Sequence, residues 1–536
     1  MEFTSFLKRK FFNYLVYQSI KNRLINLIKK INILNRFFKK KEFFFLFFFL
    51  FLAMLTKVVI ALMTQLWRDE VYIFLTAKEN SFLSLLLQRH WDTAHPPLYF
   101  IFLKFWGHYF YSPFLLRVPS LIVSFLILYC IPILAKKIDR ENFYLPFISF
   151  FFISFSHFHN SLTIVARPYP FEIFFVLISL IIFVDILNNN FQISWKKSFF
   201  WGLTAGIAFL FDYSAIWFVA GQFIFLGIHM FLNFFKKKKK TFQFFFVGIN
   251  VFLFFFILIF PLILSNIKQS FFLERYLALS FFKNPSDHIK NSLLELFGVT
   301  YEDILFKLGI TNDFIIVFYI ILNLLGFFFL FFRKKLLALF ILIEELTVIV
   351  LPLVFSFFIY PIFLGRHLNV FNLFFIIFIS YFFSFLFEKK RKLIIFFFPF
   401  FVLIIINFFI AFPKIHYVDP PYDFLTLHKK IYSYSEKEKR VIFTHAPLFM
   451  FEHLRYYNLF YPIKNLQIFD YSQLKEEGEN LLQNEDKKIK VFYIDFLFNK
   501  SDGNQYLPVD FDLSKDLNCP INKRHFIDYI YLIECL

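Results

Sequence analysis

The sequence predicts a mostly α, polytopic membrane helical bundle with a small extracytoplasmic α/β domain at its C-terminus. Two observations carry this prediction. Hydrophobic residue types make up 59% of the 536 residues, and 97 residues are Phe. A soluble protein could not bury this much apolar surface, whereas lipid can cover it. The same composition excludes a disordered or fibrous chain.

Eleven apolar runs are candidates for membrane-spanning helices. A helix rises about 1.5 Å per residue, so roughly 20 apolar residues cross the hydrocarbon core. The predicted spans are 43–66, 114–135, 143–158, 170–187, 198–211, 214–235, 242–264, 314–332, 336–358, 367–387 and 393–412. The first run is too long and too far from the N-terminus for a secretory signal. We expect a membrane domain over residues 43–412.

The formal net charge of +19 is not spread evenly along the chain. The basic segment 1–42 and the loops on the same side of the predicted alternation carry 28 Lys and Arg against 5 Asp and Glu. Short basic loops stay in the cytoplasm, so the N-terminus is expected inside and the C-terminus outside. These charges follow span ends rather than one soluble face, which argues against nucleic acid as a partner. We interpret them as topology anchors that can also contact anionic lipid.

Three larger regions are then expected on the non-cytoplasmic side. They are a first loop at 67–113, a second loop at 265–313 and a C-terminal α/β domain at 413–536. The pattern of that domain predicts strands at 441–445, 466–470, 491–496 and 526–533, and helices near 422–433, 447–457 and 472–484. Cys519 and Cys535 lie in it, so a disulfide is one hypothesis and two free thiols the other.

The first loop carries residues suited to acid–base chemistry. Arg68, Asp69 and Glu70 directly follow the first span, at the lipid–water boundary. A carboxylate at such a boundary keeps its charge through a basic or polar partner, and it can act as a general base toward an alcohol or amine. The alternative is a helix-end charge cluster without catalytic function. His95 precedes two prolines, which suit the first turn of a helix. His95 itself is either a site residue or the cap of that helix.

Three arginines are predicted at the outer ends of spans, namely Arg117, Arg167 and Arg366. A charge at membrane depth is costly and is usually paired or functional. Guanidinium groups bind phosphate bidentately, so the three together suit a phosphate-bearing ligand. The alternative is that each one reaches the phosphate of ordinary lipids. Lys57 and Glu172 are possible site or packing partners.

Several kinds of site have no signature in the sequence. We find no HExxH, no Gly-x-x-x-x-Gly-Lys-Ser/Thr loop and no CxxC. A zinc protease, a nucleotide-driven pump and a metal-cluster site are therefore not expected, and no set of metal ligands is predicted.

Four segments form an ordered set: Arg-Asp-Glu at 68–70, His-Pro-Pro-Leu-Tyr at 95–99, Leu-Arg-Val-Pro-Ser at 116–120 and Ala-Arg-Pro-Tyr at 166–169. This set resembles the integral-membrane glycosyltransferases of family 39, related to protein O-mannosyltransferases and to the bacterial lipid A aminoarabinose transferase. The resemblance covers about residues 43–412. Asp212-Tyr213 stands where the family often has His-Tyr, and Arg366-His367 where it often has Arg-Tyr.

The resemblance implies an inverting hexosyl- or pentosyltransferase that uses a polyprenyl-phosphate-linked sugar and a lipid, glycan or protein acceptor. It implies an active site on the extracytoplasmic face of the cytoplasmic membrane. By analogy Asp69 is the base and Glu70 orients or assists it. The candidates to hold the carrier phosphate or the sugar are Arg68, His95, Tyr99, Arg117, Arg167, Tyr169 and Arg366. No cofactor is obligatory, because a lipid-linked phosphate is already a leaving group, although a divalent cation could assist.

Two other functions share the same substrates. One is a transporter or flippase for lipid-linked sugars, and the other is an oligosaccharide ligase or polymerase. Transporters tend to have inverted repeats and binding sites at the membrane midplane. Here the informative polar residues lie at the outer boundary and in loops, which favours chemistry at the membrane surface.

Overall fold

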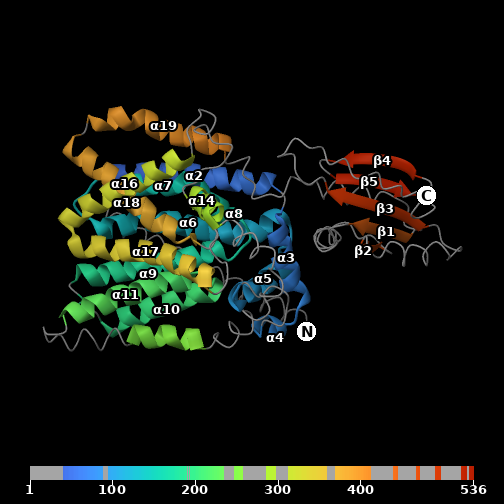
Figure 1. The fold of residues 1–536 in the computed structure, drawn as a ribbon, viewed down its shortest axis with the longest axis horizontal. Coiled ribbons are helices and arrows are strands. Elements are labelled where there is room, and N and C mark those ends of the chain that lie inside the picture. Colours follow the sequence, from blue (N-terminus) through green and yellow to red (C-terminus); the bar gives the residue numbers. More distant parts are fainter. Residues whose placement is uncertain are drawn as a thin grey trace, which may run out of the picture.

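The computed structural model describes 40–64, 66–87, 95–189, 191, 194–233, 247–257, 285–296, 312–358, 368–390, 392–411 and five strands between 439 and 535. In this part of the chain, long helices lie side by side in a bundle and the strands form a separate sheet (Figure 1). The predicted helical membrane bundle is confirmed.

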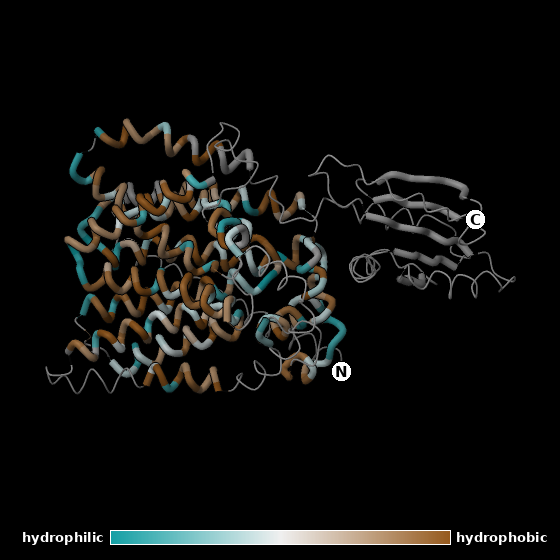
Figure 2. Tube along the Cα trace, in the orientation of Figure 1, coloured by the Kyte–Doolittle hydropathy of each residue, from teal (hydrophilic) through white to brown (hydrophobic). Residues whose placement is uncertain are grey.

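Six described helices are long and apolar enough to cross a membrane. They are α2 (Lys40–Met63), α6 (Pro113–Ile138), α9 (Tyr169–Asn188), α16 (Asn312–Arg333), α17 (Lys335–Phe358) and α18 (Phe371–Lys389). Further described helices lie in the other predicted spans: α7 (Leu145–Ser154), α10 (Trp195–Phe211), α11 (Ala215–Asn233), Val247–Ile257 and α19 (Leu393–Ala411). Each predicted span thus contains a helix, while the count of eleven crossings stays a prediction. Apolar residues dominate these helices, and many of the polar residues lie at their ends (Figure 2).

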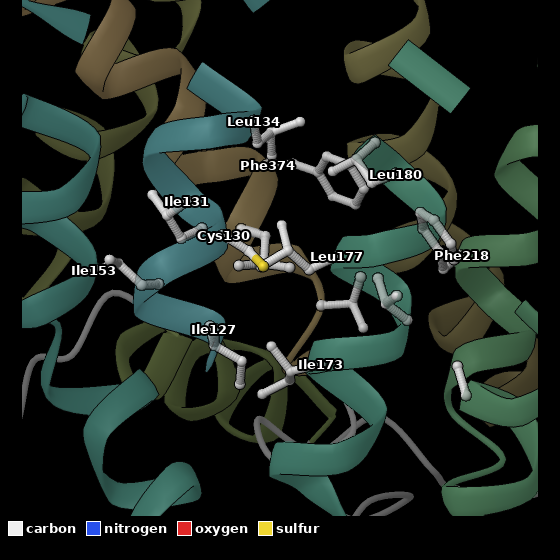
Figure 3. Close-up of a cluster of buried hydrophobic side chains, with 14 of the residues drawn as sticks. Ile127, Cys130, Ile131, Leu134, Ile153, Ile173, Leu177, Leu180, Phe218 and Phe374 are labelled. Carbon is white, nitrogen blue, oxygen red and sulfur yellow. The ribbon is translucent and has the colours of Figure 1, made fainter. Parts of the chain in front are cut away.

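The centre of the bundle is formed where α6, α9, α11 and α18 meet. Ile127 and Cys130 of α6, Leu177 of α9, Phe218 of α11 and Phe374 of α18 gather there (Figure 3), and all five are buried. The abundant Phe serves two purposes. Part of it fills this core, and part lies on outward faces such as that of α2, where lipid can cover it.

Helices α16 and α18 cross with their backbones in close contact at one glycine. A Cβ atom added at Gly326 would overlap the backbone carbonyl oxygen of Phe378. Since a carbonyl held in a helix cannot move aside as a flexible side-chain end can, the crossing requires glycine at this position.

Three helices of the first loop gather at one end of the bundle, α3 (Arg68–Glu79), α4 (Phe82–Leu86) and α5 (Pro97–Tyr109) (Figure 1). The Nζ of Lys104 in α5 donates to the carbonyl oxygens of Ala77, Lys78 and Asn80, at 3.3, 3.3 and 2.6 Å. These are carbonyls at the C-terminal end of α3, which helices leave without intrahelical partners. Lys104 thereby fixes the helix that follows His95 to the helix that carries Asp69.

The opposite end of the bundle holds basic residues in ion pairs. Arg333 pairs with Asp139, Glu141 and Glu388 at 3.2, 3.1 and 2.8 Å. Nearby in sequence, Lys137 and Lys197 both pair with Asp185, each at 2.5 Å. The C-terminal ends of α6, α9, α16 and α18 therefore meet at the end that lies away from α3. Which side of the membrane this end faces stays a prediction.

The C-terminal strands form one mixed sheet in the order β2-β1-β3-β5-β4. The strands are β1 (Lys439–Thr444), β2 (Leu466–Asp470), β3 (Ile489–Phe496), β4 (Ile521–Ile527) and β5 (Ile530–Cys535). Pairs β1–β2 and β1–β3 are parallel, and pairs β3–β5 and β4–β5 are antiparallel.

The first three predicted strands are confirmed within one or two residues. The single strand predicted at 526–533 is wrong. Ile527 pairs with Ile530, so two residues separate β4 from β5 and the chain reverses where one continuous strand was expected. The helices predicted in this domain, and Cys519, lie outside the described residues, so the domain boundary and the disulfide stay predictions.

Candidate functional site

Four of the segments singled out in the sequence meet at the α3 end of the bundle. They are the start of α3, the start of α6, the turn at 165–168 after α8 (His157–Ile164) and the turn at 212–214 after α10. Residue 95, just before α5, joins them. The bonds below show that these positions, up to 117 residues apart, are in direct contact.

Glu70 and Arg117 form a buried, bidentate ion pair. Arg117 donates from Nε to Oε1 of Glu70 at 2.8 Å and from Nη2 to Oε2 at 2.6 Å. Two backbone N–H groups complete the coordination of this carboxylate, from Trp67 to Oε2 at 2.8 Å and from Ala166 to Oε1 at 2.6 Å. Glu70 is fully buried, so its negative charge is balanced by these four donors rather than by water.

The remaining guanidinium nitrogen of Arg117 binds the end of α2. Its Nη1 donates to the carbonyl oxygen of Thr64 at 2.9 Å, to the Thr64 hydroxyl at 2.6 Å and to the carbonyl oxygen of Ala61 at 3.4 Å. The Glu70–Arg117 pair thus joins α2, α3, α6 and the turn after α8. Contact between Arg117 and a substrate, as predicted, would require some of these bonds to break.

Asp69 lies beside Glu70 on α3 but in a different environment. Its side chain is 18% exposed, and its Oδ2 lies 3.5 Å from Nη2 of Arg167. Arg167 also donates from Nη1 to the backbone carbonyl of Asp69 at 3.2 Å and from Nη2 to the Tyr169 hydroxyl at 3.2 Å. Its guanidinium lies over the rings of Trp67 and Tyr169, 5.9 and 5.5 Å from their centroids. Asp69 is therefore a partly accessible carboxylate beside a buried cation.

Each ring nitrogen of His95 has a hydrogen-bond partner. Its Nε2 lies 2.9 Å from Nη2 of Arg167, and its Nδ1 lies 3.1 Å from Oδ2 of Asp212. His95, Arg167 and Asp212 are 3%, 4% and 2% exposed. Together with Asp69 and Tyr169 they form what we call the Arg167 cluster.

A polar chain continues from Asp212 into the bundle. Oδ1 of Asp212 accepts from the backbone N–H of Ser214 at 2.9 Å, and it lies 2.8 Å from the Ser214 hydroxyl. That hydroxyl also lies 2.6 Å from Oε1 of Glu172, whose Oε2 accepts from Nδ2 of Asn369 at 2.5 Å. A hydroxyl has a single proton to donate. The second oxygen–oxygen contact therefore requires a proton on one carboxyl group, and this is Glu172, because Oδ1 of Asp212 already accepts from the Ser214 N–H.

Tyr99 was predicted to bind substrate, and the structure places it in the core beside the site. It is 1% exposed, and its ring lies against those of Phe102 and Phe171, with centroids 6.1 and 5.7 Å away. Burial, and then the negative charge of Glu70, raise the pKa of its hydroxyl well above the usual range. Tyr99 thus stays protonated at all ordinary pH values.

Lys57 lies within α2, below the end that Arg117 binds. It is fully buried and donates to the hydroxyls of Ser124 and Thr163, at 2.5 and 2.7 Å. The predicted packing role fits this geometry, since Lys57 joins α2 to α6 and α8 on the side of α2 that carries Ala61 and Thr64.

Two predicted site residues fall outside the described part of the site. The side chain of Arg68 and the whole of Arg366 lie outside what the structure describes. Conversely, the sequence did not single out Ser214 or Asn369, and it identified Asp212 only as a departure from the family pattern. A signal was available for Asp212 and Ser214, because these two polar residues interrupt the apolar sequence at the junction of the predicted spans 198–211 and 214–235. Within the described segments, no group of three or more His, Cys, Asp or Glu side chains is arranged to hold a metal ion.

No family model and no curated protein matches this sequence. Among solved structures, it is similar to ArnT from Cupriavidus metallidurans bound to undecaprenyl phosphate, with 10% identity and a TM-score of 0.52. That match covers 91% of this chain and 98% of ArnT. The apo state of the same ArnT matches at 10% identity and a TM-score of 0.43, over 92% and 98% of the two chains. The undecaprenyl phosphate complex shows that the two proteins share a fold, and it confirms at the level of the fold the resemblance seen in the motifs.

Proposed function

We propose that this protein transfers a sugar from a polyprenyl phosphate carrier to an acceptor at the α3 end of the bundle, with Asp69 as general base. The observation that carries the proposal is the pairing of Asp69 with Arg167, a partly exposed carboxylate beside a buried guanidinium. The shared fold supports the donor class, since the similar ArnT structure contains undecaprenyl phosphate.

The chemistry needs both members of this pair. The acceptor O–H or N–H bond breaks as its proton passes to the Asp69 carboxylate, and the freed electron pair attacks the anomeric carbon of the sugar. The bond between that carbon and the phosphate oxygen breaks, and its electrons leave with the polyprenyl phosphate. Attack from the face opposite the leaving group inverts the anomeric centre.

Arg167 is suited to the phosphate side of the reaction. A fixed guanidinium stabilises negative charge that grows on a departing phosphate, and its planar fork matches two phosphate oxygens. Its 3.5 Å separation from Oδ2 of Asp69 is longer than a normal hydrogen bond. The carboxylate of Asp69 is therefore not engaged in a strong hydrogen bond to Arg167 and stays able to take a proton. Arg68 and Arg366 are proposed to add positive charge to the same site.

Glu70 and Arg117 are assigned a supporting role in this proposal. Each carboxylate oxygen of Glu70 already accepts two hydrogen bonds. Glu70 is therefore poorly placed to take a proton from the acceptor substrate. The pair instead fixes the first turn of α3, and with it the position of Asp69. No metal ion is obligatory in this proposal.

The side of the membrane follows from the distribution of charge. The basic ends of the helices meet at the end of the bundle away from α3, and short basic loops remain cytoplasmic. We therefore propose that the reaction takes place at the extracytoplasmic face of the cytoplasmic membrane.

Profiling of glycans and lipids tests this function. A deletion strain should lack one glycosylated product, and the wild-type gene should restore it. The Asp69→Asn variant should be made at wild-type levels and should not restore the product. Glu141→Gln is the matched control, because Glu141 is an exposed carboxylate at the other end of the bundle.

Other outcomes would contradict the proposal. Full restoration by a folded Asp69→Asn protein would exclude Asp69 as the base. If purified protein in vesicles moved a lipid-linked sugar across the bilayer without transferring it, a flippase would replace the transferase. Accumulation of an unpolymerised or unligated oligosaccharide carrier in the deletion strain would instead indicate a ligase or polymerase.

A further inference from the structure

The hydrogen bonds of His95 determine which of its ring nitrogens carries the proton. An arginine side chain has only donors, so Nε2 of His95 must accept the bond from Nη2 of Arg167, 2.9 Å away. In a neutral imidazole the proton is then on Nδ1. The Nδ1–H group faces Oδ2 of Asp212 at 3.1 Å, and a carboxylate oxygen can accept it.

The orientation of the Asp212 carboxylate is fixed from its other side. The backbone N–H of Ser214 donates to Oδ1 at 2.9 Å, and a backbone N–H cannot exchange its role with an acceptor. Oδ1 must therefore remain an acceptor, and Oδ2 is the atom presented to His95. Ser214 begins the turn into α11, so the local fold determines this orientation.

We propose that Asp212 is a positioning residue that sets the tautomer of His95 and, through it, the orientation of Arg167. The sequence of contacts runs from Asp212 to His95 and from His95 to the guanidinium that we assign to the carrier phosphate. Asp212 bonds to His95 and Ser214, and its proposed effect reaches Arg167 through His95. The consequences for activity rest on the proposed function, whereas the assignment of the tautomer does not.

Three hydrogen bonds within the described part of the chain orient the Arg167 guanidinium in this arrangement. Its Nη2 is shared between His95 and the Tyr169 hydroxyl, and its Nη1 is held by the backbone carbonyl of Asp69. If Nε2 of His95 carried a proton, two N–H groups would face each other at 2.9 Å. Arg167 would have to turn away from that position. A buried cation that can lie in several directions is poorly placed to meet a phosphate.

The Asp212→Asn substitution tests this step with almost no change in shape. The Ser214 N–H group requires an acceptor at the Oδ1 position, so the amide oxygen of Asn would lie there. The amide NH₂ would then lie at the Oδ2 position and donate to Nδ1 of His95. The proton of the ring moves to Nε2, facing Arg167. In the serine protease triad the equivalent Asp-to-Asn change acts in this way, by imposing the wrong tautomer.

The first measurement is the ¹⁵N NMR spectrum of selectively ¹⁵N-histidine-labelled, full-length protein in nanodiscs. The signals of His95 are identified by their loss in His95→Gln. In the wild-type protein we expect a protonated Nδ1 and an unprotonated Nε2, and in Asp212→Asn the reverse. Ser214→Ala is the control, since it removes the hydroxyl but keeps the backbone N–H that orients Asp212, and the wild-type tautomer should remain.

Two spectroscopic results would overturn the proposal. A wild-type His95 protonated on Nε2, or on both nitrogens at neutral pH, would contradict the tautomer without any need for a variant. An Asp212→Asn protein that retains the wild-type tautomer would show that Asp212 does not set it.

The second measurement is the rate of sugar transfer. Asp212→Asn should retain the thermal stability of the wild type and lose on the order of 100-fold in transfer rate, the effect of misplacing a group by about 1 Å. The losses from Asp212→Asn and His95→Gln should not add in the double variant, because both act through Arg167. Wild-type transfer by a folded Asp212→Asn protein, or fully additive losses, would reject the positioning role. Absence of transfer by the wild-type protein would instead reject the proposed function and leave the tautomer assignment standing.

Discussion

Arg117 binds both carboxylate oxygens of Glu70, and both side chains are buried, 3% and 0% exposed. These two residues are 47 positions apart, and their contact joins the first loop to the helix that follows it. Asp69, the adjacent residue, is the proposed base. The neighbouring carboxyl groups of α3 thus have different environments. That of Glu70 is surrounded by donors of the protein, and that of Asp69 is accessible to a reactant.

Breaking this pair should destabilise the protein strongly. Glu70→Gln leaves Arg117 as a buried charge without its counterion, which costs about 3–5 kcal/mol in comparable cases. The expected result is a large fall in the melting temperature of the detergent-solubilised protein, measured by fluorescence-detected size exclusion after heating. Glu141→Gln removes a carboxylate whose side chain is 84% exposed and should leave the melting temperature nearly unchanged. Equal behaviour of the two variants would contradict the structural role of Glu70.

Arg167→Lys should weaken use of the lipid-linked donor. Lysine keeps the charge but loses the planar fork that holds two phosphate oxygens and bonds to His95 and Tyr169. We expect the KM for the donor to rise by about tenfold or more, equivalent to about 1.4 kcal/mol, while the KM for the acceptor changes little. Arg333→Lys makes the same change at the opposite end of the bundle and should leave the donor KM unaffected. A raised acceptor KM with an unchanged donor KM would assign Arg167 to the acceptor.

Removal of divalent cations should not abolish transfer. The proposed reaction uses a leaving group already activated as a phosphate ester and a guanidinium to stabilise its charge. Protein treated with a chelator and assayed in metal-free buffer should retain most of its activity. Loss of activity that returns on addition of one particular divalent cation would show that a metal takes part.

Thr163→Val should destabilise the bundle through Lys57. The substitution keeps the shape of the side chain but removes the hydroxyl that accepts from the buried Lys57 ammonium at 2.7 Å. Loss of a buried acceptor costs about 1–3 kcal/mol. Thr204→Val is the matched control, because the Thr204 hydroxyl bonds to carbonyl oxygens of its own helix. Thermal unfolding of the two variants should differ clearly, and similar melting temperatures would argue against a structural role for the Lys57 contacts.

Gly326→Ala should loosen the contact between α16 and α18. The added methyl group would overlap the carbonyl oxygen of Phe378, and forcing extra volume into a close-packed contact typically costs about 1–3 kcal/mol. Gly227→Ala is the control, since a Cβ at that position meets no atom within 4 Å in the described structure. The Gly326 variant should melt at a lower temperature than the Gly227 variant. If both melt with the wild type, the two helices are not packed as closely as described.

The helices of the bundle could be predicted because the residues that form each helix are continuous in the sequence. A run of apolar residues is a local signal, and each predicted span contains a helix. The hairpin of β4 and β5 could not be foreseen in the same way, because Asp528 and Tyr529 give no strong turn signal. The sequence therefore predicted one strand where the chain makes two.

The partners within the site could be predicted only in part. Arg68, Asp69, Glu70 and Arg167 were recognisable from their motifs, and the residue types alone suggested acid–base chemistry and phosphate binding. The sequence could not show that Arg117 binds Glu70 while Arg167 lies beside Asp69, because either arginine could reach either carboxylate. The three-dimensional arrangement of α3, the start of α6 and the turn after α8 decides between them.

The contacts of Asp212 and Glu172 have a consequence for the order in which the protein is made. His95 meets Asp212 117 residues later in the chain, and Glu172 meets Asn369 197 residues later. At synthesis rates of about 5–20 residues per second, these partners leave the ribosome roughly 6–23 s and 10–40 s after the residues they bind. Glu172 therefore enters the membrane before its partner Asn369 has been made. The polar chain that runs from His95 to Asn369 becomes complete only after Asn369 has been made, late in the synthesis of the membrane domain.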